Sequence, residues 1–434
     1  MFLPVLWMFG GSFLVDGRPS LENYQGVFTD YSNALLFLNS LLLAFLTTLI
    51  AALIGVFTGF LLGKTNLPMK GLYRNLFFLP FIIPSYIYGL AWVNLLGKTG
   101  PLNKFLSALP FLTEEGISGF IYGPFGASMV LGLSFFPIVM LISEGSLSRI
   151  DSHLEESGLV QAGRGRVLRN ILFPLAAPGL LSGMLIVFIL SLSEFGVPFL
   201  LGVKVLTTEI FTQFSAFYNE KAAVALSIPF VFVTVSLMLL ERGYLKGRSF
   251  EALGRRGTAR THLYHLGRWK IPCLVFCSLV LCLSVFLPLI SLIIDSGSLD
   301  AYRKAFLLAR QAITNTLIFG AIGATLLTLL GLVVGYFSEK GRLSLGKGIE
   351  FSTLMLFALP ATVLGVGLIK LWNRPQIPFP WVYGTFLIII IGYVARFSPV
   401  ALRLMADSYK QVSTSLAEAG EVLGANWWRL MGQI

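Results

Sequence analysis

The sequence predicts an all-α, polytopic membrane protein built from two helical bundles in parallel repetition. Hydrophobic residues make up 56% and charged residues only 12% of the 434 residues, and the mean hydropathy is +0.80. A typical soluble domain contains about 25% charged residues. Apolar runs of about 18 or more residues, each long enough to cross a bilayer as a helix, recur along the whole chain. Landmark residues of the first half also recur in the same order in the second half.

The first bundle is predicted at residues 1–241, with about six spans. Phe2–Val15 is apolar but covers only about 21 Å of a hydrocarbon core of about 30 Å, so we expect it to form the outer part of a first spanning helix. Pro80 and Pro84 lie inside one of the complete spans, where each removes a backbone hydrogen bond, so a kink or break is expected there. The complete spans are expected at 35–63, 76–96, 120–142, 175–201 and 222–240.

Residues 242–270 are predicted to be a basic cytoplasmic linker, in which Glu251 is the single acidic residue. The second bundle is predicted at 271–434 with about four spans. Under this alternation every basic loop falls on the same side, which is the positive-inside bias that sets orientation. The net charge of +11 therefore indicates no nucleic-acid partner. The expected spans are 271–294, 314–337, 354–372 and 381–404.

The two bundles share an internal repeat. Because the matched spans run in the same direction, the duplication is parallel rather than inverted. The first bundle continues with two further spans after the matched region, whereas the second stops at Ile434, so we expect a fragment whose second bundle lacks its last two helices. The matched pairs are Asn39/Asn315, Gly55/Gly331, Gly59/Gly335, Lys64/Lys340, Pro80/Pro360, Trp92/Trp372, Phe135/Phe397, Pro137/Pro399, Glu156/Glu418 and Gly158/Gly420.

Two polar segments on the basic side, 145–173 and 406–434, are predicted to be docking loops for a cytoplasmic partner. Ala and Gly permit close helix approach, Gly424 can end a short helix in the left-handed conformation, and the Glu side chain can bind a basic residue of a partner. One copy alone would equally suit an amphipathic connector, but two copies in matching places favour docking. The pattern residues are Glu156, Ser157, Gly158, Ala162 and Gly163 in the first copy and Glu418, Ala419, Gly420 and Gly424 in the second.

These loops resemble the Glu-Ala-Ala-x3-Gly-x9-Ile-x-Leu-Pro loop of ABC importer permeases. The second copy fits this pattern as far as Ile434, and the first keeps Glu156, Ile171 and Pro174. The first copy has Ser, Ala and Phe at three positions where the pattern has Ala, Gly and Leu. Fused double-length permeases of ferric-iron importers resemble the chain further, in Asn39–Ala44, Gly100–Asn103, Glu194–Pro198, Leu206–Thr208 and Leu359–Pro360.

The resemblance implies the type I permease fold in the bacterial inner membrane. It implies two copies of a cytoplasmic ABC ATPase on the docking loops, and a periplasmic or lipid-anchored solute-binding protein outside. It implies no cofactor, no resident metal and no catalytic residue in this chain, since ATP hydrolysis belongs to the ATPase. Ferric iron is the implied cargo, with thiamine, phosphonate, sulfate and polyamine as alternatives.

Glu194 is a carboxylate within an apolar segment, where charged residues are usually functional or paired. Together with Ser193 it is a candidate for the translocation path or its gate. An equally good interpretation is a structural partner for Arg396 or for a backbone group. Arg396, mid-span where the first bundle has Ser134, is a similar candidate and a candidate for the bundle interface.

Two other classes of protein fit the sequence less well. An ion-coupled secondary transporter needs carboxylates in several spans, and Glu194 is nearly alone in that respect. A membrane-embedded enzyme needs a constellation such as paired His or Asp inside the membrane. The three His of the chain, two of them in the predicted linker, do not supply one.

Overall fold

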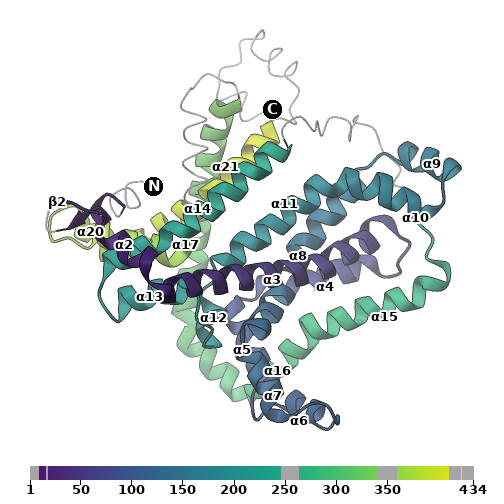
Figure 1. Ribbon diagram of the computed structural model, residues 1–434, viewed down its shortest axis with the longest axis horizontal. Helices are drawn as coiled ribbons and strands as arrows, with labels where there is room; N and C mark the ends of the chain where they lie inside the picture. Colours follow the sequence, from purple (N-terminus) through teal and green to yellow (C-terminus); the bar gives the residue numbers. More distant parts are fainter. Residues whose placement is uncertain (1–8, 16–17, 246–262, 340–358, 410–421, 423–434) are drawn as a thin grey trace. The chain divides into compact units, whose positions relative to one another are not determined.

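The computed structural model describes the chain except for residues 1–8, 16–17, 246–262, 340–358, 410–421 and 423–434 (Figure 1). Among the described residues, six helices are long and apolar enough to cross a membrane, and a sharply bent helix pair makes a seventh candidate. The chain divides into two compact units. The larger unit comprises residues 25–218 and 232–303, and the smaller comprises residues up to 24, 219–231 and 304–434.

Three long helices form the centre of the larger unit: α3 (Tyr31–Lys64), α8 (Pro124–Ser148) and α11 (Phe173–Leu192). Glycine allows α3 and α8 to approach closely, because a Cβ added at Gly55 would lie 2.7 Å from the Cβ of Val139. Small residues serve the same purpose in membrane helices generally, where packing rather than hydrophobicity holds helices together. The close crossing places the C-terminal end of α3 beside the C-terminal end of α8, where Gly63 lies against Glu144.

The span predicted at 76–96 is a bent pair, α4 (Lys70–Ile82) and α5 (Ser85–Leu96), with an angle of 97° between the two helices. This confirms the predicted break. Pro84 has no N–H to give to the carbonyl of Pro80, and the Ser134 hydroxyl of α8 donates to that carbonyl at 3.4 Å. A neighbouring helix thus satisfies a backbone group that the proline leaves free, as the membrane interior requires.

A helix that follows the linker packs on this bent pair. It consists of α15 (Lys270–Leu281), a π-helical turn η4 (Cys282–Phe286) and α16 (Leu287–Asp295). Residues of α15 and η4 contact α4, and α16 contacts α5. The remaining elements of the larger unit are α6 (Pro101–Ser107), α7 (Glu114–Ile121), α9 (Ser152–Gln161), α10 (Arg164–Val167), η1 (Leu168–Leu172), α12 (Gly196–Leu200), α13 (Leu206–Ser215) and η3 (Gly267–Trp269).

The smaller unit contains most of α17 (Leu299–Glu339), with α19 (Ala361–Trp372), α20 (Phe379–Tyr383) and α21 (Leu387–Tyr409). A Cβ added at Gly331 of α17 would lie 2.8 Å from Cγ of Met405 and 3.1 Å from the carbonyl oxygen of Ala401, both on α21. Lys370 forms an ion pair of 2.9 Å with Glu220. Three helices have residues in both units: α17, α2 (Glu22–Thr29) and α14 (Glu220–Leu245).

The prediction that the first helix reaches Val15 is wrong for its last two residues. Leu14–Val15 is a short strand, β1, paired antiparallel with β2 (Arg18–Pro19). The apolar stretch is too short to span, and its last backbone groups pair in a hairpin instead, with Pro19 at the end of β2 where no N–H is needed. The division into bundles at 1–241 and 271–434 stays a prediction, since compact packing and sequence duplication need not divide a chain at the same place.

Candidate functional site

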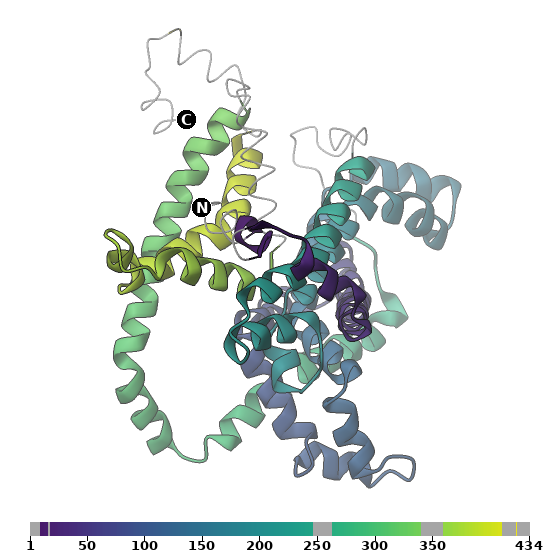
Figure 2. The same cartoon turned by 60° about the vertical axis from the view of Figure 1, so that its left-hand side comes forward.

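The first docking loop folds as a short helix, α9, across one end of the larger unit. The Asp151 carboxylate begins this helix by accepting a hydrogen bond of 3.0 Å from the backbone N–H of His153, as N-cap residues do. Figures 1 and 2 place α9 at the end of the larger unit opposite to α6 and α7. A turn of chain through α10 and η1 then leads into α11.

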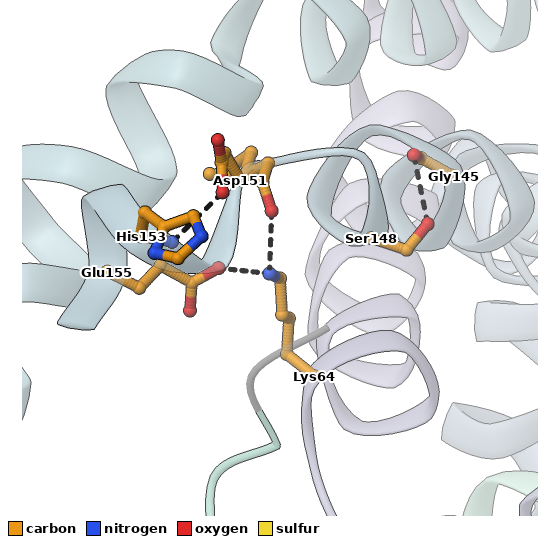
Figure 3. A network of polar contacts seen from close by, with 7 residues as sticks. Lys64, Gly145, Ser148, Asp151, His153 and Glu155 are labelled. Atoms are coloured by element: carbon orange, nitrogen blue, oxygen red, sulfur yellow. Dashed lines mark hydrogen bonds and ion pairs between the residues drawn. The ribbon is translucent and has the colours of Figure 1, made fainter. Parts of the chain in front are cut away.

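The inward face of α9 is fastened by a buried ion pair (Figure 3). Lys64, the last residue of α3, pairs with Glu155 of α9 and also donates to the carbonyl of Ile150 at 3.5 Å. Both charged side chains are fully buried. Removing one partner of such a pair leaves an uncompensated buried charge, so the position of α9 depends on the end of α3.

The outward face of α9 carries the predicted docking residues. Glu156 and Ser157 are both exposed. The Ser157 hydroxyl donates to the carbonyl of His153 within the same helix, at 2.7 Å. Val160 on the same helix is 88% exposed and Leu154 is 47% exposed. Of the two adjacent glutamates, Glu155 is therefore buried against the bundle and Glu156 is exposed.

The small residues of the motif have separate roles. A Cβ added at Gly158 would lie 2.6 Å from Cδ1 of Ile171, so this glycine lets α9 lie close to η1. Ala162, where the family pattern has glycine, ends α9 with φ −145° and ψ 155°, which is extended backbone open to any residue. Gly163 precedes α10 with a φ of −66°. Alanine can therefore stand at position 162 in place of the glycine of the family pattern, because the backbone there is not in the left-handed conformation.

A second ion pair fastens the same end of the unit. Arg74 of α4 binds Glu144 of α8 through two nitrogens, with the Nε to Oε2 distance at 3.0 Å. The Arg74 side chain is 49% exposed and the Glu144 side chain 10%. The Glu144 carboxylate is thus mostly buried, and its contact with two nitrogens of Arg74 holds the start of α4 against the end of α8.

Most of the second predicted docking loop lies outside the described residues, and with it Glu418, Ala419, Gly420 and Gly424. Its sequence still differs from the first copy at one informative position. The repeat aligns Lys64 with Lys340, but it aligns Glu155 with Ala417. A pair equivalent to Lys64–Glu155 cannot form from these two residues.

Glu194 lies where the span predicted at 175–201 breaks, between α11 and α12. Its carboxylate accepts hydrogen bonds from the Ser85 hydroxyl at 2.8 Å and from the backbone N–H of Gly196 at 3.1 Å. Its carbonyl accepts from the Thr207 hydroxyl at 2.8 Å. Ser85 opens α5, directly after the bend of the α4–α5 pair, so Glu194 joins two broken spans at their breaks.

The other two candidates for the path occupy different surroundings. Ser193, buried next to Glu194, is the residue at which α11 ends. Arg396 belongs to the smaller unit, where it donates to the carbonyl of Leu359 at 2.7 Å, just before the start of α19. Each of Glu194 and Arg396 thus has a backbone partner, which was the structural alternative considered for Glu194.

Sequence reasoning missed the roles of Lys64 and Glu155 in the site. Lys64 was visible only as a repeat landmark at the end of an apolar helix, and Glu155 only as the neighbour of Glu156. The spacing within α9 is a signal that could have marked Glu155 as a buried residue, but nothing in that spacing points to Lys64. Ser152 and Glu155 are three residues apart and both buried, whereas Glu156 and Ser157 are exposed, as expected of a helix with one buried face.

Comparison with known proteins adds independent information. Residues 53–243 match the family of binding-protein-dependent transport system inner membrane components. The chain is 27% identical, over 91% of its length and 64% of the relative's, to the putative ferric transport system permease protein FbpB 1 of Haemophilus influenzae. It is 28% identical, over 88% of its length and 57% of the relative's, to the ferric transport system permease protein FbpB of Actinobacillus pleuropneumoniae. The chain thus spans less than two thirds of both relatives.

A third relative covers a shorter part of the chain. The putative 2-aminoethylphosphonate transport system permease protein PhnU of Salmonella typhimurium is 28% identical over 52% of this chain and 79% of its own length. Together with the apolar helices, these matches confirm the predicted fold class, an all-α polytopic protein of the type I ABC importer permease kind. They also confirm the predicted multi-pass location in the inner membrane.

Proposed function

We propose that this chain, whose residues 53–243 belong to the family of binding-protein-dependent transport system inner membrane components, is the permease subunit of an ABC importer. It receives a small solute from a periplasmic or lipid-anchored binding protein. A separate cytoplasmic ABC ATPase, in two copies, drives the solute across the membrane. The two predicted bundles rock between inward and outward access as the ATPase pair closes and opens.

The observation that carries this proposal is that Glu155 is buried in an ion pair while the next residue, Glu156, is exposed. A short helix that is fixed to the bundle on one side and presents an exposed carboxylate and exposed apolar residues on the other suits the groove of a second protein. Because Lys64 ends α3, a displacement of α9 is passed directly to a membrane-spanning helix. The first docking loop is therefore proposed as the ATPase contact, with the loop at 406–434 as its second copy.

Ferric iron is the proposed cargo, because two relatives that match most of this chain are named as ferric transport permeases. The match to a 2-aminoethylphosphonate permease over half of the chain supports phosphonate as the second candidate. Uptake of radiolabelled ferric iron into cells that express the permease with its ATPase and binding protein distinguishes them. Ferric uptake that excess 2-aminoethylphosphonate does not reduce is the expected result, and uptake of the phosphonate instead would overturn the iron assignment.

Docking is tested by reversing charge on both loops. Glu156→Lys combined with Glu418→Lys is expected to abolish co-purification of the ATPase with the permease, because each carboxylate would be replaced by a like charge facing a basic partner. Glu114→Lys with Glu115→Lys makes the same change of charge on exposed residues at the start of α7 and should leave co-purification intact. Retained co-purification in the docking double variant would contradict the proposal.

For the path, we propose that Glu194 and Ser193 belong to a gate in the larger unit. The support is that Glu194 holds together two spans at their breaks, through Ser85 and Gly196. Glu194→Gln keeps an acceptor oxygen but removes the charge, and we expect at least a fivefold fall in uptake with ATPase binding unchanged. Unchanged uptake would remove Glu194 from the gate. Arg396 stays a candidate for the path or its gate, and its guanidinium donates to the carbonyl of Leu359.

A further inference from the structure

The last residues of the linker lie against the loop that follows α3. The N–H of Tyr264 donates to the carbonyl of Lys64 at 2.7 Å, and the N–H of Asn66 donates to the carbonyl of Tyr264 at 3.3 Å. These bonds form a short parallel bridge between Thr65 and Tyr264. The linker end is thus joined to the residue that pairs with Glu155 and to its two successors.

The side chain of Asn66 adds two contacts to this junction. Its Oδ1 accepts from the N–H of Leu266 at 3.0 Å, which fixes the orientation of the amide. The amide nitrogen therefore donates to Nδ1 of His265 at 3.1 Å. Asn66 and His265 are both exposed, so these contacts can be removed without opening the core.

Tyr264 reaches from the linker to the docking helix. Its side chain is 6% exposed, and its ring centroid lies 6.3 Å from that of Phe60 on α3. Burial, followed by the neighbouring Glu155 carboxylate, raises the pKa of Tyr264 well above its usual value. The hydroxyl thus keeps its proton beside the carboxylate that pairs with Lys64.

Beyond the linker end, the helix pair α15–α16 is attached to α4 and α5 at intervals along its length. The hydroxyls of Tyr73 and Ser278 are 2.9 Å apart, and the Tyr88 hydroxyl donates to the carbonyl of Ser284 at 2.9 Å. At the far end, Asn94 donates to the Asp295 carboxylate at 3.0 Å. Any displacement at the start of α15 is therefore transmitted along the bent α4–α5 pair.

We propose that residues 264–266, which we name the strap, position the docking helix α9 relative to α15, so that one docking loop moves two membrane helices, α3 and α15. The strap contacts the end of α3 through its backbone and the docking helix through Tyr264, and it continues into α15 within a few residues. Its role in transport rests on the proposed function, but its role in positioning does not.

The first test measures coupling. Asn66→Ala removes both side-chain contacts to the strap, and we expect the amount of cargo transported per ATP hydrolysed to fall at least threefold in proteoliposomes while ATP hydrolysis persists. Asn39→Ala is the matched control. It makes the same substitution within α3, away from the strap, and removes a side-chain hydrogen bond to the carbonyl of Lys204 instead. A wild-type transport ratio in Asn66→Ala would overturn the strap's role in coupling.

The second test needs neither ATPase nor cargo. Spin labels at exposed His153 and Arg268, introduced as H153C and R268C in a background with the three native cysteines replaced by alanine, report the distance between α9 and the start of α15. We expect one narrow distance distribution in the isolated permease and at least a twofold broader one when Asn66→Ala is added. An unchanged distribution would refute the strap even if transport is confirmed, whereas failure to bind any ATPase would refute only the proposed function.

Discussion

The two copies of the repeat agree where helices cross and differ where side chains hold the crossing helices in place. In the larger unit Gly55 of α3 lies against Val139 of α8, and in the smaller unit Gly331 of α17 lies against Ala401 of α21. Gly331 is the repeat partner of Gly55, and Ala401 stands where the first copy has Val139. The close crossing has been kept in both copies because only a residue without a side chain fits there.

The side chains that donate a hydrogen bond to a backbone carbonyl beside each broken span differ between the two copies. Ser134 donates to the carbonyl of Pro80 in one copy, and its repeat partner Arg396 donates to the carbonyl of Leu359 in the other. One acceptor is the carbonyl of Pro80 and the other is the carbonyl of Leu359, which precedes Pro360, yet one donor is a short neutral hydroxyl and the other a long charged side chain. The requirement to satisfy the backbone has been retained, while the side chain that does so has changed.

The docking loops differ most. The copy with the less regular motif has Glu155, which fastens α9 to Lys64, whereas the copy with the more regular motif has Ala417 at that position. In the first copy, the residue just before the motif fixes α9 to its own bundle, and the exposed motif residues are the ones proposed to contact a partner. Four experiments use this contrast, in order of expected effect.

Giving the first copy the alanine of the second should have the largest effect. Glu155→Ala leaves the Lys64 ammonium buried without a counter-charge, at a cost of about 3–5 kcal/mol in the free energy of unfolding. Adding Lys64→Met should restore most of the loss, because apolar residues tolerate burial. Thermal unfolding in detergent measures both, and exposed Glu156→Ala should stay within about 0.5 kcal/mol of wild type.

Filling the helix crossings should have an intermediate effect that differs between the copies. Gly55→Ala brings a Cβ within 2.8 Å of the carbonyl oxygen of Phe136, a backbone atom that cannot move alone, and should cost about 1–3 kcal/mol. Gly331→Ala meets Cγ of Met405, which can rotate away, and should cost less. Thermal unfolding of the two variants measures the difference, and equal losses in unfolding temperature would contradict it, because the two crossings would then tolerate an added methyl group equally poorly.

Removing the braces should have the smallest effect. Ser134→Ala is expected to cost about 0.6 kcal/mol, the average for hydrogen bonds between membrane helices, and Arg396→Met up to about 1.7 kcal/mol. Thermal unfolding of the two variants in parallel provides the measurement. A larger loss of stability for Ser134→Ala than for Arg396→Met would contradict this order. It would mean that the bend of α4–α5 depends strongly on the Ser134 hydroxyl, although its hydrogen bond is long at 3.4 Å.

Much of the fold was predictable, because long apolar segments can be satisfied in a membrane only as helices. The break at Pro80 and Pro84 followed from proline chemistry, and the structure has a bend of 97° there. The hairpin at Leu14–Val15 was not predictable, since the pairing of a few backbone groups leaves no trace in hydropathy.

The short helix in the first predicted docking loop, with an exposed Glu156, could be predicted from the sequence, but its attachment to the bundle could not. Lys64 and Glu155 are far apart in the chain, and a single sequence does not show which distant charges pair. The same holds for Glu194. The sequence offered the adjacent Ser193 as its companion, but Ser85 and Thr207, which donate hydrogen bonds to Glu194, come from other segments of the chain. Contacts between segments are decided by packing, which the periodicity of one segment does not specify.

The most direct test separates the two adjacent glutamates of α9. Glu155→Gln and Glu156→Gln make the same chemical change one residue apart, and both thermal unfolding and ATPase binding are measured on each purified variant. We expect Glu155→Gln to lower the unfolding temperature while folded protein still binds the ATPase, and Glu156→Gln to weaken ATPase binding with an unchanged unfolding temperature. If both variants lose the same property, or if the two effects are reversed, α9 does not divide into an anchored face and a docking face.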